Sequence, residues 1–297
     1  MKSELRHGLI LLLTAAIWGF AMAFQREGSR YLSPLSFNAC RFTLGALALF
    51  PLMLRDNKIH QSPLTGREAL SGAVLGAILF LASLLQQAGV GEAGAGKAGF
   101  LTALYVVLVP VLGVFLGKKT GLFTWLALLL ALPALYLLCV PENEKFSLAP
   151  SDSVILIGSV VWALHILCTD RFVKKILPIK LCVCQFAVGA LFNWVGALLF
   201  ETVTLQNIMR ALVPILYCGV MSTGVGYLCQ TIGQKGCRPA FAALIMSTEA
   251  VFCVIAGALM LGERMTYRGY IGCALMLLAV VLAQAGDLLP RKEETHV

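Results

Sequence analysis

Long uncharged apolar stretches follow one another along almost the whole chain, separated by short polar connections. A helix that crosses a hydrocarbon core of about 30 Å needs about 20 apolar residues. The stretches have this length and lack the alternation of barrel strands. They predict an all-α integral membrane protein with ten transmembrane helices at residues 8–24, 35–54, 69–91, 98–117, 120–141, 153–169, 181–200, 211–234, 239–262 and 269–286.

The chain also repeats itself at an offset of 144 residues. At this offset Trp18 aligns with Trp162, Pro34 with Pro178, Phe42 with Phe186, Gln86 with Gln230 and Gly89 with Gly233. We therefore predict two five-helix repeats, residues 1–145 and 146–286, followed by a cytoplasmic tail at 287–297. Because five is odd, the second repeat is inverted relative to the first. Inverted repeats are typical of secondary transporters that work by alternating access, although a duplication with no alternating access has the same pattern.

Basic residues in the connections predict the orientation. With the N-terminus inside, the inner connections hold fifteen Lys and Arg residues and the outer ones seven, with Arg41 left inside a segment. The positive-inside rule then predicts that both termini are cytoplasmic. The first segment also ends in Ala21-Met22-Ala23, as a cleaved secretory signal does. Its counterpart in the second half favours a retained helix.

The composition agrees with a membrane protein and narrows the chemistry. Of the 297 residues 59% are hydrophobic and 13% charged, against about a quarter charged in soluble domains. We assign the net charge of +8 to membrane orientation and not to nucleic-acid binding. The ten cysteines lack C-x-x-C spacing, so we expect no metal site, and no motif indicates an ATP site, a hydrolase or another cofactor.

Ionisable side chains at bilayer depth cost free energy, so each one is a candidate for a functional role. Glu249 lies mid-way along the ninth segment and is our candidate for substrate contact or proton coupling; the alternative is a hydrogen bond that joins two helices. Arg41 lies in the second segment, where it either has a structural role, such as snorkelling to the interface, or attracts an anionic substrate. His165 follows Trp162 by one turn and suits either a cavity wall and coupling or an interhelical hydrogen bond.

Uncharged polar and aromatic side chains also occur at mid-segment. Gln86 and Gln230 are equivalent in the two repeats and can bind a solute or simply join helices. Trp18, Tyr105 and Trp162 lie away from the interfacial belts where such residues concentrate. Buried indole and phenol groups need hydrogen-bond partners, which either a polar cavity or helix packing supplies.

The chain resembles the EamA family of the drug/metabolite transporter superfamily along essentially its whole length. The resemblance rests on several runs: Ala16 to Gly19; Arg41 after Ser33-Pro34; Phe100-Leu101-Thr102 to Pro110; Trp162 to His165; Gln185-Phe186; Gly219 to Gln234; Ala243 to Glu249; and Leu261-Gly262-Glu263. Segment four has no acid that matches Glu249, so the halves are not chemically equivalent.

The resemblance implies a central cavity and the transport of small metabolites, often outward. We hypothesise a carrier in the bacterial inner membrane that exports amino acids or related solutes. Its expected partners are the small-molecule solute, the lipid bilayer and, if transport is coupled, protons; the protein is expected to be a monomer or a homodimer. The expected substrate-binding residues are Trp18, Gln86, Thr102, Tyr105, Trp162, His165, Gln185, Gln230 and Glu249, with coupling at Glu249 and His165. The alternatives are a non-transporting scaffold or sensor with a static core and, less favoured, an intramembrane enzyme built on Glu249 and His165.

Overall fold

The computed structural model describes residues 2–93, 95–118, 120–140, 150–261 and 266–288, and within these ranges the regular structure is entirely helical. The helices are α1 (Lys2–Gly28), α2 (Pro34–Ile59), α3 (Gly66–Ala93), α4 (Ala95–Ala103), α5 (Tyr105–Phe115), α6 (Leu122–Cys139), α7 (Pro150–Val173), α8 (Pro178–Phe200), α9 (Leu205–Arg210), α10 (Leu212–Leu216), the π-helix η1 (Tyr217–Gly226), α11 (Tyr227–Lys235), α12 (Pro239–Met246), α13 (Glu249–Leu261) and α14 (Tyr267–Leu288).

Eight helical segments in the described part of the chain are long and apolar enough to cross a membrane. The fourth and tenth predicted segments coincide with two shorter apolar helices, Gly99–Phe115 and Tyr267–Ala283. The outside of the bundle is strongly apolar, with Phe115, Leu198 and Phe200 each more than 70% exposed. A soluble monomer does not expose apolar surface on this scale, so the outer surface fits a lipid environment.

Four of the described helices begin with proline, and the residue before it is described for three of them. Pro34, Pro178 and Pro239 each occupy the first turn of a helix, after a residue with extended backbone. The fixed φ of proline suits the first helical turn, where its missing N–H leaves no bond unmade, and it disfavours helix in the preceding residue. These positions therefore separate α2, α8 and α12 sharply from their preceding connections.

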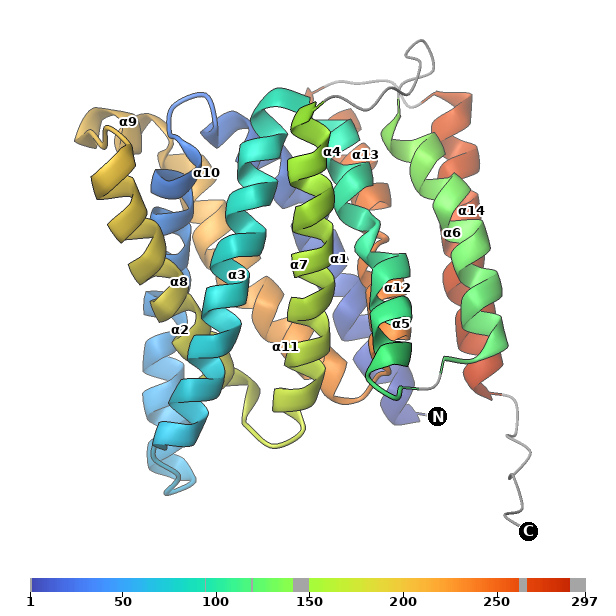
Figure 1. The fold of residues 1–297 in the computed structure, drawn as a ribbon, viewed down its shortest axis with the longest axis horizontal. Coiled ribbons are helices and arrows are strands. Elements are labelled where there is room, and N and C mark those ends of the chain that lie inside the picture. Colours follow the sequence, from blue (N-terminus) through green and yellow to red (C-terminus); the bar gives the residue numbers. More distant parts are fainter. Residues whose placement is uncertain (1, 94, 119, 141–149, 262–265, 289–297) are drawn as a thin grey trace.

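The helices cross between two faces of the bundle (Figure 1). We call the face at which α1 begins the N-terminal face; α5, α7, α11 and α14 end there, whereas α1 ends and α7 begins at the opposite face. Helix α2 packs on α8, and α6 packs on α14. Each of these pairs joins the same segment of the two sequence repeats. The predicted boundary at 145/146 and most of the tail at 287–297 lie outside the described residues, as do Gly262 and Glu263 of the EamA resemblance.

Candidate functional site

Two membrane segments are broken at equivalent places. Helix α4 ends at Ala103 and α5 begins at Tyr105, while α12 ends at Met246 and α13 begins at Glu249. Leu104 lies at the first break and Thr248 at the second, and the two positions are 144 residues apart. Figure 1 shows α4 and α13 toward the opposite face and α5 and α12 toward the N-terminal face. Both breaks therefore lie within the bundle, between its two faces.

Side chains satisfy carbonyl groups next to the second break. The hydroxyl of Ser247 donates to the carbonyl of Leu244 at 2.8 Å, and that of Thr248 donates to the carbonyl of Ile245 at 2.7 Å. Irregular backbone is tolerated at membrane depth only where it is buried in protein or lines a cavity. Interrupted helices in corresponding positions of two repeats are the strongest structural pointer to a binding site in secondary transporters.

A third irregular element, the π-helix η1, joins α10 to α11. Wide turns of this kind are rare and often occur at functional sites. Helix η1 packs against α2 so closely that a Cβ atom on Gly45 would lie 2.4 Å from a methyl carbon of Thr223. This contact brings Ser222 of η1 and the following Tyr227 to the centre of the bundle.

A cavity lies where these irregular elements meet. Its walls come from α1, α2, α3, both halves of the first broken segment, α7, η1, α11 and α13. The lining residues are Trp18, Met22, Gln25, Arg41, Gln86, Thr102, Tyr105, Trp162, Ile166, Ser222, Tyr227, Gln230 and Glu249. The cavity is therefore a polar and aromatic chamber inside an otherwise apolar bundle.

Most of the residues that the sequence singled out line this chamber. They are Trp18, Arg41, Gln86, Thr102, Tyr105, Trp162, Gln230 and Glu249. His165 and Gln185 do not line it: both are at most 1% exposed, and their side chains are joined by a hydrogen bond of 3.0 Å between Nε2 and Oε1. His165 instead lies behind the wall, edge-on to the ring of Trp162 at 5.8 Å.

Tyr227 is the centre of the aromatic wall. Its ring centroid lies 4.9 Å from that of Trp18 and 6.4 Å from that of Trp162, with the latter pair stacked. Trp18 Nε1 donates to the backbone carbonyl of Ser222 at 3.2 Å. A Cβ atom on Gly226 would lie 2.7 Å from Trp18 Nε1, so glycine is required for this approach. The rings thus form a rigid apolar surface on one side of the chamber.

Several polar atoms of the lining are without a hydrogen-bond partner in the described part of the chain. They include the Trp162 indole N–H, the Tyr105 hydroxyl and the Thr102 hydroxyl. Buried polar groups in proteins nearly always have a partner, so these groups are available to a solute or to water. No described residue forms an ion pair with Glu249 or Arg41, and the two do not pair with each other.

Sequence reasoning missed five lining residues: Met22, Gln25, Ile166, Ser222 and Tyr227. Four of them carried a signal in helical spacing, since Ile166 follows Trp162 by four residues. Met22 and Gln25 follow Trp18 by four and seven residues, on one face of α1, and Tyr227 precedes Gln230 by three. Ser222 could not be found this way, because its position depends on the π-helix.

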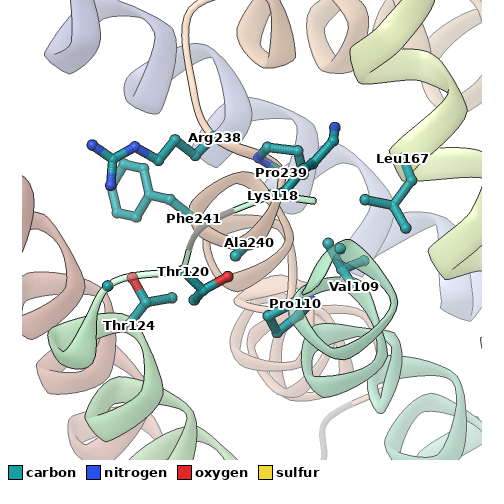
Figure 2. Close-up of a pocket in the computed structure, with 12 residues that line it drawn as sticks. Val109, Pro110, Lys118, Thr120, Thr124, Leu167, Arg238, Pro239, Ala240 and Phe241 are labelled. Carbon is teal, nitrogen blue, oxygen red and sulfur yellow. The ribbon is translucent and has the colours of Figure 1, made fainter. Parts of the chain in front are cut away.

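A second, smaller pocket lies nearer the N-terminal face and shares no lining residue with the chamber. Figure 2 shows Val109 and Pro110 of α5 on one side of it and Thr120, Ala240 and Phe241 on the other. Lys118, which also lines this pocket, pairs with Asp170 of α7, as does Lys174 at 3.0 Å. These contacts join α5 to α7 near the N-terminal face, below the chamber.

The comparison with protein families decides the identity of the fold. The model of the EamA-like transporter family matches residues 6–140 and again residues 150–284. The chain belongs to the EamA-like transporter family. The two matched ranges start 144 residues apart and end 144 residues apart, which is the offset found in the sequence. The protein is thus a multi-pass membrane transporter of this family.

Relatives of similar length are also named as transporters. An "uncharacterized transporter" of Archaeoglobus fulgidus is 26% identical over 92% of this chain and 83% of its own length. Bacillus subtilis YwfM and YyaM, printed as uncharacterized transporters, are 23% and 26% identical over at least 97% of both chains. A solved crystal structure superposes with a TM-score of 0.78 at 16% identity, covering 98% of this chain and 100% of the other, and supports the fold.

Proposed function

We propose that this EamA-like protein is a secondary transporter that moves small metabolites by alternating access of two inverted five-helix halves. The observation that carries the proposal is the meeting of two equivalently broken helices at one polar chamber. Irregular turns of this kind at membrane depth are tolerated where they line a cavity, and Thr102, Tyr105 and Glu249 beside the two turns line this one. The opposite directions of α1 and α7 in Figure 1 support the inversion.

The packing of the halves supports two-fold pseudosymmetry. Helix α3 packs on α7 of the other half, and α1 packs on α11; in the repeat these are the same contact made twice. The first helix of each half likewise packs against the broken segment of the other, α1 on α13 and α7 on α5. An exchange of conformations between equivalent halves would open the chamber alternately to each face.

Amino acids or related solutes are the substrates that we propose, with export as the direction. The chamber combines flat apolar rings, three amides, one basic and one acidic side chain, which together suit a small solute with both apolar and polar parts. Glu249 is the proposed coupling residue, because it is the one carboxyl group among the lining residues. The N-terminal face, with its basic connections, is the proposed cytoplasmic face.

The alternatives are less well supported by the geometry. A static scaffold or sensor needs no polar chamber, whereas this core has one whose lining includes unpaired donors. An intramembrane enzyme built on Glu249 and His165 would need both groups to face one substrate. His165 lies behind the wall and is bonded to Gln185, so the pair does not converge in the chamber.

Reconstitution tests the proposal. The full-length protein in liposomes is expected to take up at least one member of a broad panel of amino acids and small metabolites, with saturation at high concentration. Empty liposomes control for leakage. A separate sample of the purified protein is checked for folding. If that sample is folded and no panel member crosses faster than in empty liposomes, the transporter assignment fails.

A further inference from the structure

Arg41 is buried with half of its guanidinium group unused. The residue is 2% exposed, and its Nη1 donates a single long hydrogen bond of 3.3 Å to Oε1 of Gln25. Nε and Nη2 have no partner among the described residues. Because Arg41 and Gln25 both line the central chamber, the unused donors belong to a group that a bound solute can reach.

The two unused nitrogens are the ones that matter for recognition. Nε and Nη2 lie on one edge of the planar guanidinium group, and their N–H bonds are parallel. This edge matches the two oxygens of a carboxylate, which arginine binds with two parallel hydrogen bonds. Gln25 holds the third nitrogen, and the ring of Phe42 lies 4.9 Å from the guanidinium carbon. The guanidinium plane is therefore held while its bidentate edge remains free.

The charge of Arg41 also lacks compensation. A buried charge is stable only when it is paired, and no described carboxylate pairs with this one. Arg41 is the one basic residue in the chamber lining, so the site matches one negative charge and not the two of a phosphate monoester. Tyr227 and Glu249 line the same chamber as Arg41.

We propose that Arg41 is the carboxylate subsite of the chamber and that the transported solute carries a single carboxylate, bound side-on by Nε and Nη2. This inference rests on the proposed transport function and restricts its substrate class. Gln25 is a positioning residue that orients the guanidinium group. The remainder of the solute lies along the rings of Trp18 and Tyr227, and an amino group, where there is one, faces Glu249.

The test uses matched solutes on the wild-type protein in liposomes. Leucine and phenylalanine are compared with their amides, leucinamide and phenylalaninamide, and with their decarboxylated forms, isoamylamine and phenylethylamine. Other monocarboxylates and their amides complete the panel. We expect uptake of at least one acid, inhibited by its amide or amine at least tenfold less well than by the acid itself. Uptake only of amides or amines overturns the carboxylate subsite but keeps the transporter. Uptake of no solute overturns both.

A pair of variants tests the role of the bidentate edge of Arg41. Arg41→Lys keeps the charge but loses the bidentate edge, and we expect its half-saturating acid concentration to rise at least tenfold. The matched control is Arg210→Lys, at an exposed position on α9, which is expected to behave as wild type. Equal half-saturation in Arg41→Lys and wild type overturns the proposal. If Arg41→Lys does not fold, the acid-against-amide comparison on the wild-type protein decides alone.

Discussion

At the scale of single residues, the chamber holds one acid and one base on a largely aromatic and amide background. Burying either charge at bilayer depth is costly, so each is expected to act in binding or coupling. Glu249 opens α13, immediately after the break, where its carboxyl group lines the chamber. The break thus exposes this side chain to a solute while lipid remains excluded.

Replacing Glu249 by glutamine removes the proton-binding group and keeps the size of the side chain. We expect Glu249→Gln to fold and to lose the pH dependence of transport, so that rates at mildly acidic and mildly alkaline pH become equal. The rates are measured in liposomes with the wild type alongside. Glu27→Gln, at a partly exposed site near the end of α1, is the control and is expected to keep the wild-type profile. An unchanged pH profile in Glu249→Gln would exclude it as the coupling residue.

At the scale of elements, the contact between α1 and α13 fixes the acid in the chamber. A Cβ atom on Gly19 would lie 2.5 Å from the Cβ atom of Phe252 and 2.7 Å from the carbonyl oxygen of Glu249. Gly19 is therefore required for α1 to approach the start of α13, and it places the neighbouring Trp18 against the chamber.

Gly19→Ala is expected to push α1 away from α13 and to cost about 1–3 kcal/mol of stability, the usual range for overpacking. Transport is expected to fall with it, because Trp18 and Glu249 move apart. Gly113→Ala is the control: the nearest atom to its Cβ would be 3.7 Å away, and alanine inside a helix stabilises by about 0.5–1 kcal/mol relative to glycine. Thermal unfolding in detergent measures the stability of the two variants, and uptake into liposomes measures their transport. Equal melting temperatures for the two variants would contradict the packing argument.

The sequence predicts the elements better than it predicts their interruptions. Apolar length, which the thickness of the hydrocarbon core dictates, locates the eight long helical segments and the two shorter apolar helices of the described chain. The breaks at Leu104 and at Ser247-Thr248 have no glycine or proline at the break itself, whereas Pro51, Pro110 and Pro133 lie inside continuous helices. Tertiary packing, which a local pattern does not contain, decides where these segments break.

The candidate site was also predicted only in part from the sequence. The cost of polar groups in a membrane predicts which side chains lie at mid-depth, and most of those line the chamber. It does not predict on which side of the wall a side chain lies. His165 Nε2 and Gln185 Oε1 share a hydrogen bond behind the wall, an arrangement that depends on the packing of α7 near α8. Tyr227 was missed because its place beside Trp18 and Trp162 depends on how α11 packs against α1 and α7.

At the scale of the whole molecule, the regions around the two halves of the broken segments differ. Every described residue of α12 from Ala240 to Met246 is buried, whereas Phe252, Cys253 and Ile255 of α13 are only partly buried. On the same side as α12, Asp170 of α7 binds Lys118 and Lys174, which ties the end of α5 to α7. The region near the N-terminal face is thus closely packed by α12 and by the contact between Lys118 and Asp170.

Asp170→Asn removes the charge that the two lysines share. Asp170 is 1% exposed while its partners remain in contact with solvent, so we expect a loss of about 1–3 kcal/mol, the range for a broken buried hydrogen bond. Lys174→Gln is the control; its side chain is 57% exposed, and its loss is expected to cost at most about 0.5 kcal/mol. Thermal unfolding of the purified protein measures both. A larger loss of stability for Lys174→Gln than for Asp170→Asn would contradict this stabilising role of Asp170.

Counterflow in liposomes tests the central claim, alternating access of two inverted halves around one chamber, most directly. Liposomes are loaded with an unlabelled solute that the protein accepts, diluted into a trace of the labelled solute, and followed without any ion gradient. A carrier that exposes its site to one side at a time predicts transient accumulation of label above equilibrium, faster with loaded than with unloaded liposomes. Uptake that only approaches equilibrium, at the same rate with and without internal solute, would contradict alternating access.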